Sequence, residues 1–147
     1  MSSEGKDQLV LFDFGAVRKY PADFLNSYHR MIKSSLHNDI EGLHQAATEL
    51  KFVHADDDPK LIKHFEEFCL CSIEPFLKDQ DYDWKNTDLP QRLTKKAFQM
   101  IQDFHLRPPP QEVLFLDRKT GGVFIFLSVL NAKINGRPVL LKYLENI

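Results

Sequence analysis

The residues that could do metal-dependent chemistry lie near the start of the sequence, in the segment QLVLFDFGAVRKYP (residues 8–21). Four apolar residues with strand propensity run directly into Asp13, Phe14 and Gly15. In an Asp-Phe-Gly triplet the carboxylate can hold the magnesium that bridges nucleotide phosphates, the ring can pack in a core, and the glycine permits an unusual turn. The triplet by itself fits an ordinary strand-to-turn junction better than a metal site. Features elsewhere in the chain are needed to distinguish the two.

The chain around this triplet has the composition of one packed globular domain. Its 147 residues, 43% of them hydrophobic, are enough to bury a core, and we expect a single domain over 1–147. The formal net charge is -2 and the basic residues are scattered, so no nucleic-acid partner is expected. Residues 1–7 lack the apolar core of a signal peptide, and Cys69 and Cys71 lack the geometry of a disulfide, which suits an intracellular, reducing compartment.

Apolar residues recur at helical spacing along most of the chain after the strand, which predicts a mainly α fold. The first helix is expected over about 22–37, the second from the N-cap Asp39 to 50, and the third from the N-cap Asp58, with Pro59 in its first turn, to Pro75. A fourth helix is expected over about 91–105. A fifth is expected from 112, with an interruption near Gly121 and Gly122, and a short one after Pro138. The polar segment 78–90 has no period and is expected to be a loop. The buried face of the helix over 91–105 is expected to hold Leu93, Ala97, Met100, Ile101 and Phe104.

One run in the second half of the chain, residues 123–130, is apolar on all sides. It is too short to span a bilayer, and a helix that is apolar all round is normally buried on every side. We therefore expect this run in the core rather than against lipid.

The strand over 8–12 has no partner in this pattern. A single strand cannot satisfy its own backbone hydrogen bonds, and EGKDQ (residues 4–8) resembles a hairpin turn whose first strand is absent. We expect a helical bundle with one residual strand or hairpin at its N-terminal edge, and a chain that begins in the middle of a domain.

Three short motifs are spread along the chain, and the first of them contains the triplet. They are DFGA.R.Y in residues 13–20, PPP.E in residues 108–112 and L.RK.GG in residues 116–122. In order and spacing they resemble the C-terminal portion of the UbiB/AarF family, the atypical kinase-like proteins of coenzyme Q biosynthesis, with the mitochondrial-type branch most similar. The resemblance covers residues 8 to about 144.

The resemblance implies a protein-kinase-like fold, of which this chain would be the helical C-terminal lobe. It implies Mg²⁺ and ATP as cofactors of an atypical kinase or ATPase that supports ubiquinone biosynthesis, with Asp13 as the magnesium ligand and Phe14 and Gly15 completing the signature. It also implies ubiquinone-biosynthesis proteins or a membrane surface as partners, and the cytoplasm or the mitochondrial matrix as the location. No chemical role follows for four other matching positions, which are Arg18, Tyr20, Arg118 and Lys119.

The other motifs of that family are absent from the 147 residues. They are the alanine-rich nucleotide loop, its lysine, a Lys-x-Gly-Gln motif and the catalytic loop with its Asp and Asn. Without the phosphate clamp and the second metal ligand, we expect this chain alone to be catalytically incomplete, whether or not it still binds Mg-ATP. The alternative is a non-catalytic helical module that binds lipid or a partner protein, or that associates with itself through a surface the missing parts would cover.

Other chemistries are disfavoured by residue spacing. HADDDP (residues 54–59) shares His and Asp with the catalytic loop of the family but follows the triplet, and an acidic helix N-cap explains it better. Asp79, Asp81 and Asp83 begin like a calcium loop, but the glycine and glutamate required later in such a loop are missing. No His-x-x-x-His pair for zinc and no Gly-x-Ser-x-Gly elbow for a hydrolase are present.

Overall fold

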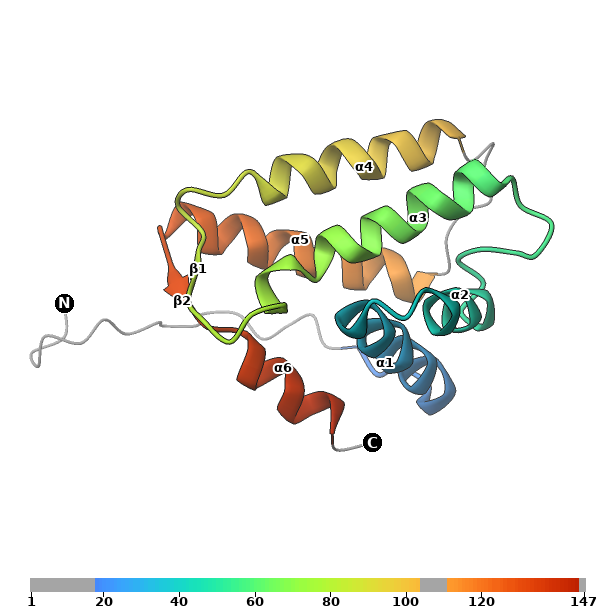
Figure 1. Ribbon diagram of the computed structural model, residues 1–147, viewed down its shortest axis with the longest axis horizontal. Helices are drawn as coiled ribbons and strands as arrows, with labels where there is room; N and C mark the ends of the chain where they lie inside the picture. Colours follow the sequence, from blue (N-terminus) through green and yellow to red (C-terminus); the bar gives the residue numbers. More distant parts are fainter. Residues whose placement is uncertain (1–17, 104–110, 146–147) are drawn as a thin grey trace, which may run out of the picture.

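The computed structural model of the chain describes residues 18–103 and 111–145, and within these ranges the fold consists of α-helices and one short strand pair (Figure 1). The helices are α1 (Ala22–His37), α2 (Ile40–Glu49), α3 (Pro59–Ser72), α4 (Leu89–Asp103), α5 (Gln111–Val129) and α6 (Arg137–Leu144). A 3-10 turn, η1 (Glu74–Phe76), follows α3, and the strands β1 (Tyr82–Asp83) and β2 (Lys133–Ile134) pair antiparallel. The expected mainly α-helical fold is confirmed. The expected strand over 8–12 and the Asp13 triplet lie outside the described residues.

Two residues connect α1 to α2, and local hydrogen bonds explain this tight connection. Asn38 takes the left-handed conformation, with φ of 55°, and ends α1. The side chain of Asp39 then accepts a hydrogen bond from the backbone N–H of Gly42 at 3.0 Å, as expected for the N-cap of α2. A Cβ at Gly42 would lie 2.2 Å from Asp39 Oδ2, so the turn requires glycine there.

The helix α3 begins where the sequence predicted and ends at Ser72, three residues before the expected end at Pro75. The side chain of Asp58 caps it by accepting from the N–H of Lys60 at 2.8 Å, and Pro59 occupies its first turn. The helix ends at Ser72, and Pro75 lies in the 3-10 turn that follows. The interpretation of HADDDP as an acidic N-cap is thereby confirmed.

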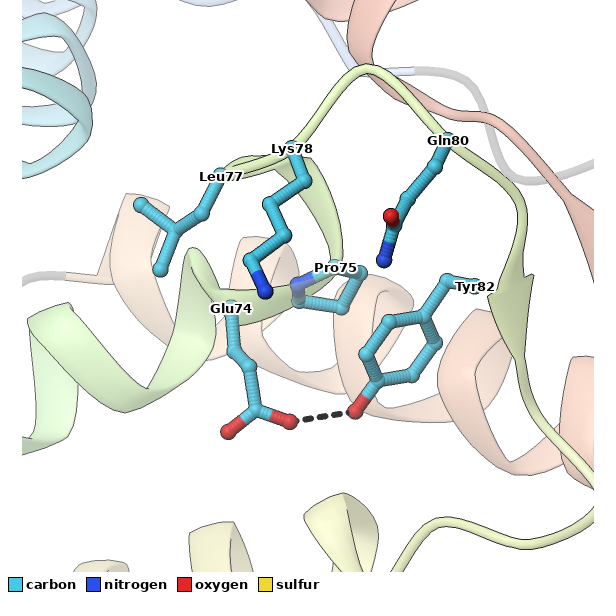
Figure 2. A pocket seen from close by; sticks show the side chains of 6 residues that line it. All are labelled: Glu74, Pro75, Leu77, Lys78, Gln80 and Tyr82. Carbon is cyan, nitrogen blue, oxygen red and sulfur yellow. Dashed lines mark hydrogen bonds between the residues drawn. The ribbon is translucent and has the colours of Figure 1, made fainter.

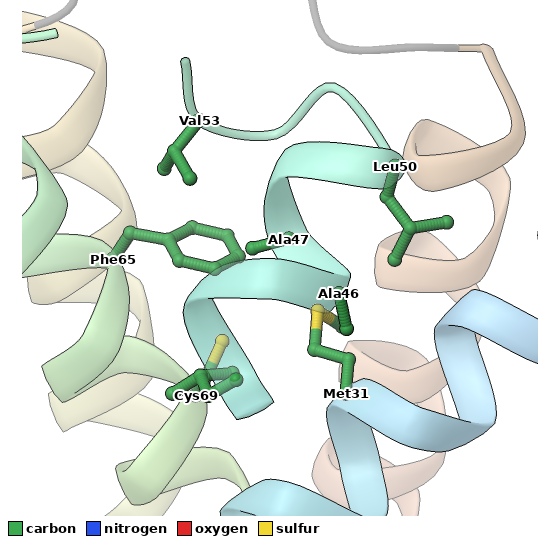
Figure 3. Close-up of a cluster of buried hydrophobic side chains, with 8 residues drawn as sticks. Met31, Ala46, Ala47, Leu50, Val53, Phe65 and Cys69 are labelled. Atoms are coloured by element: carbon green, nitrogen blue, oxygen red, sulfur yellow. The ribbon is translucent and has the colours of Figure 1, made fainter. Parts of the chain in front are cut away.

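The first core cluster lies where α1, α2 and α3 meet (Figure 3). The small residues Ala46 and Ala47 of α2 are almost fully buried, and they let Met31 of α1 and Phe65 and Cys69 of α3 approach from either side. Leucine and valine side chains at 43, 50 and 53 close the cluster. Interdigitation of large and small side chains is what fixes the distances between these helices.

A second cluster includes residues of the segment 78–90, most of which is a loop as expected. Trp84 is 2% exposed and Leu89 is fully buried, and the Trp84 ring packs against Phe124 of α5 with centroids 4.9 Å apart. The backbone N–H of Trp84 donates to the carbonyl of Ala132 at 3.0 Å, next to the β1–β2 pair. The segment is polar on average, yet the single apolar residues Trp84 and Leu89 in it are buried. An isolated apolar residue produces no periodic pattern, so its burial could not be predicted from the sequence. The helix α4 also begins at Leu89, two residues before the expected start.

The expectations for α5 were wrong in two respects. Gly121 and Gly122 do not interrupt it, because the helix runs without a break from Gln111 to Val129. The run 123–130 is not buried on every side: Phe124 is buried, whereas Ile125 is 57% exposed and Val129 is 72% exposed. One face of α5 packs on the second cluster, and no other element of the described chain covers the opposite face. On α4, Ile101 was expected in the core but is 63% exposed, and Phe104, expected on the same face, lies outside the described residues.

The short helix α6 packs through Leu144 against Leu36 of α1 and against Ile73, the residue that follows α3. Arg137 at its start donates from Nη1 to the carbonyls of Phe76 and Leu77, at 2.7 and 3.0 Å. Within residues 18–103 and 111–145, no helix has the length and apolar character that crossing a membrane requires.

Candidate functional site

The predicted ligand Asp13 and its neighbours Phe14 and Gly15 lie outside the described residues. The described chain begins at Arg18, three positions after the triplet. The described surroundings of the site are the residues that follow the triplet and those that contact them.

Arg18 joins the segment after the triplet to the start of α5. Its Nη2 lies 3.1 Å from Oε1 of Glu112, and the two side chains are 34% and 28% exposed. Its guanidinium also lies over two rings, 4.7 Å from the centroid of Phe115 and 5.9 Å from that of Tyr20. A planar guanidinium can pair with a carboxylate at its edge while it stacks on an aromatic face, which a lysine cannot do. Arg18 is thus held from two directions.

A row of stacked rings leads from this ion pair along α1. The Tyr20 and Phe24 centroids are 5.6 Å apart, and those of Phe24 and Tyr28 are 5.8 Å apart. The ring planes are inclined by 20° and 13°, so each ring is stacked on the next. The four-residue spacing puts the three side chains on one face of the chain as it enters the helix. This row connects the Arg18 contact to the first core cluster, against which Phe24 and Tyr28 pack.

Asp117 of α5 lies at the inner end of this row. Burial, and next the charge of Asp117, raise the pKa of Tyr28 well above its usual value, and the same two causes raise the pKa of Cys69. Part of Asp117 is open to solvent, yet enough protein surrounds its carboxyl that burial raises its pKa to about 6. A carboxyl group with this pKa can take up or release a proton near neutral pH.

These contacts link described residues of the three sequence motifs along the ring row, with Arg18 and Glu112 at its outer end and Asp117 at its inner end. The first motif supplies Arg18 and Tyr20, the second Glu112, and the third Asp117. Arg18 and Tyr20, which had no assigned role, now hold the segment after the triplet against α5. Asp117 was not among the residues predicted from the sequence, although it lies inside the motif L.RK.GG and is its only acidic residue.

Two other matching positions remain on the surface. Arg118 and Lys119 are exposed on α5, and neither forms an ion pair with another of the described residues. They do not join the ring row, so the structure separates them from Arg18 and Tyr20.

The described ranges contain no group of three or more His, Cys, Asp or Glu side chains placed to hold a metal ion. Two of the loop aspartates instead accept hydrogen bonds, Asp79 from a distant side chain and Asp83 from its own turn. Asp79 accepts a hydrogen bond from Asn135 Nδ2 at 2.6 Å, and Asp83 accepts from the N–H of Lys85 and from Asn86. Cys69 and Cys71 are free and belong to different core clusters.

A small hollow lies beside η1 and the loop that follows it (Figure 2). Its volume is about 180 Å³, below the roughly 300 Å³ at which small-molecule sites begin. Glu74 at its edge accepts a hydrogen bond from the Tyr82 hydroxyl and pairs with Arg92 of α4 at 2.7 Å. Arg92 in turn pairs with Asp88 at 2.7 Å. These groups satisfy one another, so we assign the hollow a structural role.

Comparison with known proteins gives the class to which the chain is similar, that of atypical kinases. No protein-family model matches the chain. The chain is 27% identical over 95% of its length to the mitochondrial atypical kinase COQ8 of Schizosaccharomyces pombe, and 28% identical over 90% to the mitochondrial atypical kinase COQ8B of Rattus norvegicus. It is 26% identical over 95% of its length to the probable serine/threonine-protein kinase abkA of Dictyostelium discoideum.

The matched regions are 23%, 25% and 26% of those three proteins, so the chain spans about a quarter of the length of the curated relatives it matches. The resemblance to UbiB-type atypical kinases that the motifs indicated is confirmed, and the particular relatives are COQ8 proteins.

Proposed function

We propose that the chain is the helical, magnesium-binding part of a COQ8-type atypical kinase or ATPase that supports ubiquinone biosynthesis. The observation that carries this proposal is the linkage of described motif residues, Arg18, Glu112 and Asp117, through one ring row in a chain similar to COQ8 kinases over nine-tenths of its length. A linkage of motif residues is expected if those residues serve one site.

Asp13 is the proposed magnesium ligand. Magnesium prefers carboxylate oxygens and is commonly held by one or two carboxylates together with substrate phosphates, so the donor type fits. When bound, the ion would bridge and neutralise the phosphates of ATP. Five residues of chain reach at most about 18 Å, so Asp13 stays within that distance of Arg18. The ion pair and rings that hold Arg18 therefore limit where the carboxylate can lie.

The 147 residues contain neither the nucleotide lysine nor the catalytic loop of the family. We propose that, tested alone, they can hold nucleotide but do not transfer phosphate at a measurable rate. The names of these COQ8 relatives describe them as mitochondrial. We propose the same location for this chain.

Thermal unfolding with and without millimolar Mg-ATP tests the proposal. Binding to the folded state at one hundred times Kd stabilises by about 2.7 kcal/mol, a shift of roughly 5–10 °C in Tm for a chain of this size. We expect the shift in the wild-type chain and its loss in Asp13→Asn. Asp56→Asn, in an exposed loop, is the matched control and should keep the shift. No shift in the wild-type chain would refute nucleotide binding by this chain.

A second candidate is a non-catalytic interaction module that binds a protein partner or lipid. The open apolar face of α5 is the observation that favours it. In that case Mg-ATP leaves the melting curve of the wild-type chain unchanged, whereas substitutions on the outer face of α5 abolish binding to the partner.

A further inference from the structure

The outer face of α5 is an apolar surface that the described chain leaves open except at Phe115, over whose ring the guanidinium of Arg18 lies. Seven large side chains on it are between 46% and 72% exposed: Leu114, Phe115, Val123, Ile125, Phe126, Val129 and Leu130. At 100° per residue, Phe115, Gly122, Phe126 and Val129 lie along the middle of this face, opposite the buried Phe124. Single exposed apolar residues are common on protein surfaces, but seven on one face of one helix indicate an interaction surface.

Two glycines at the middle of this helix indicate what kind of partner covers the face. No atom lies within 4 Å of a Cβ built on Gly121 or Gly122. Glycine is among the least favourable residues in a helix interior, and its usual benefit is the close approach of another backbone. Nothing in the described chain makes that approach. A second helix would use the space, whereas a lipid surface gains nothing from a missing side chain.

We propose that the partner is a second copy of this chain, with the two α5 helices crossing antiparallel about a two-fold axis at Gly122. Such an isologous contact places the same residues of both copies against each other. Phe115 of each copy then faces Val129 of the other, and the two copies of Gly122 lie against each other at the axis.

The charges on this face are compatible with the pairing. Arg118 of one copy faces the ring of Phe126 in the other, where a guanidinium can form a cation–π contact. The face also carries Lys119, between Phe126 and Leu130 on the helical wheel. Along the axis the two Arg118 side chains are eight residues apart, about 12 Å, and the two Lys119 side chains six residues apart, about 9 Å, and both distances exceed the screening length of roughly 8 Å at physiological salt. Their mutual repulsion is therefore weak.

The available area is close to what a stable dimer needs. A fully exposed aromatic side chain offers roughly 150–250 Å², so a half-exposed large side chain offers about 100 Å². The seven side chains together provide at most about 700 Å² per copy, compared with about 800 Å² per partner in a standard interface. We expect a dissociation constant on the order of micromolar.

Sedimentation velocity of the full chain tests the proposal. At about 100 µM, well above a micromolar dissociation constant, the wild-type chain should be a dimer. Phe126→Glu should make it a monomer, because a charge would be buried at the interface. Phe98→Glu is the matched control: Phe98 is 61% exposed on α4, and its substitution should leave the dimer intact. Circular dichroism melts check that both variants fold.

A cross-link gives an independent measurement of the axis. Gly122→Cys should form a disulfide between copies on mild oxidation, because the native Cys69 and Cys71 are buried and do not compete. Gln99→Cys, at an exposed position on α4, should not cross-link.

Two results would overturn the proposal. One is that the wild-type chain stays monomeric at about 100 µM and the Gly122→Cys variant forms no disulfide between copies. Both measurements are independent of Mg-ATP binding. The other is a monomeric chain that floats with vesicles containing anionic phosphatidylglycerol and loses flotation in Phe126→Glu. In that case the face binds a membrane rather than a second copy.

Discussion

The Arg18 contact should behave as a stacked ion pair and not as an ordinary surface salt bridge. Arg18 Nη2 lies 3.1 Å from Glu112 Oε1, and the guanidinium lies 4.7 Å from the Phe115 centroid. A partly exposed ion pair contributes about 0.2–1 kcal/mol, and a stacked guanidinium about 0.5–1 kcal/mol more. We expect Arg18→Ala to lower the free energy of unfolding by about 1–2 kcal/mol, and Glu112→Ala by at most about 1 kcal/mol.

Arg18→Lys separates the two contributions because it keeps the charge and removes the planar stack. Its cost, about 0.5–1 kcal/mol, should persist at high salt, whereas the effect of Glu112→Ala should shrink as the screening length falls to roughly 3 Å at 1 M. The assay is urea unfolding followed by circular dichroism, on the wild type, Arg18→Ala, Glu112→Ala and the double variant.

The pair of Arg30 and Glu49 is the matched control. It joins α1 to α2, its side chains are 55% and 45% exposed, and within the described chain no ring lies over Arg30. Arg30→Lys should therefore change the stability by less than about 0.5 kcal/mol. If Arg18→Lys is equally neutral, or if the double-variant cycle shows no coupling between Arg18 and Glu112, the stacked ion pair does not contribute as inferred.

The carboxyl of Asp117 and the ring of Trp84 give two further predictions. The folded-state pKa of Asp117, about 6, lies above its ordinary value, so ionisation costs folding free energy that grows as the pH rises toward 6 and is constant above it. Because the side chain is partly exposed, we discount the cost to about 1 kcal/mol. Asp117→Asn should be more stable than the wild type by that amount at neutral pH, with no difference near pH 4 in urea melts; an equal difference at both pH values would contradict the assignment. Trp84 is 2% exposed and packs on Phe124, so Trp84→Ala should cost about 3–5 kcal/mol by circular dichroism. A cost below about 1 kcal/mol would mean that the ring is not a core residue.

The first three helices were predictable because their signals are local. Asp39 and Asp58 cap the helices that follow them through hydrogen bonds to N–H groups two or three residues away. Pro75 ends the region of α3 for an equally local reason, since proline lacks the donor that a helix interior needs. Such interactions depend on neighbours in the sequence, and the rest of the molecule did not change them.

Burial on α5 and in the loop before α4 was not predictable in the same way. All-round apolarity of residues 123–130 cannot distinguish a helix buried on every side from one with an open apolar face. Only the position of Trp84 against Phe124 determines which side of α5 is covered. Trp84 itself stands in a polar segment, where a single anchor residue produces no period.

The sequence by itself determined the residue types of the candidate site, the three motifs and the caps that start the helices, because these depend on neighbours along the chain. Tertiary structure alone decided that Arg18 meets Glu112, which is 94 positions away, and that Asp117 lies beside the ring row of α1. Contacts at such separations arise from how whole helices pack, and helix packing depends on the shapes of many side chains at once.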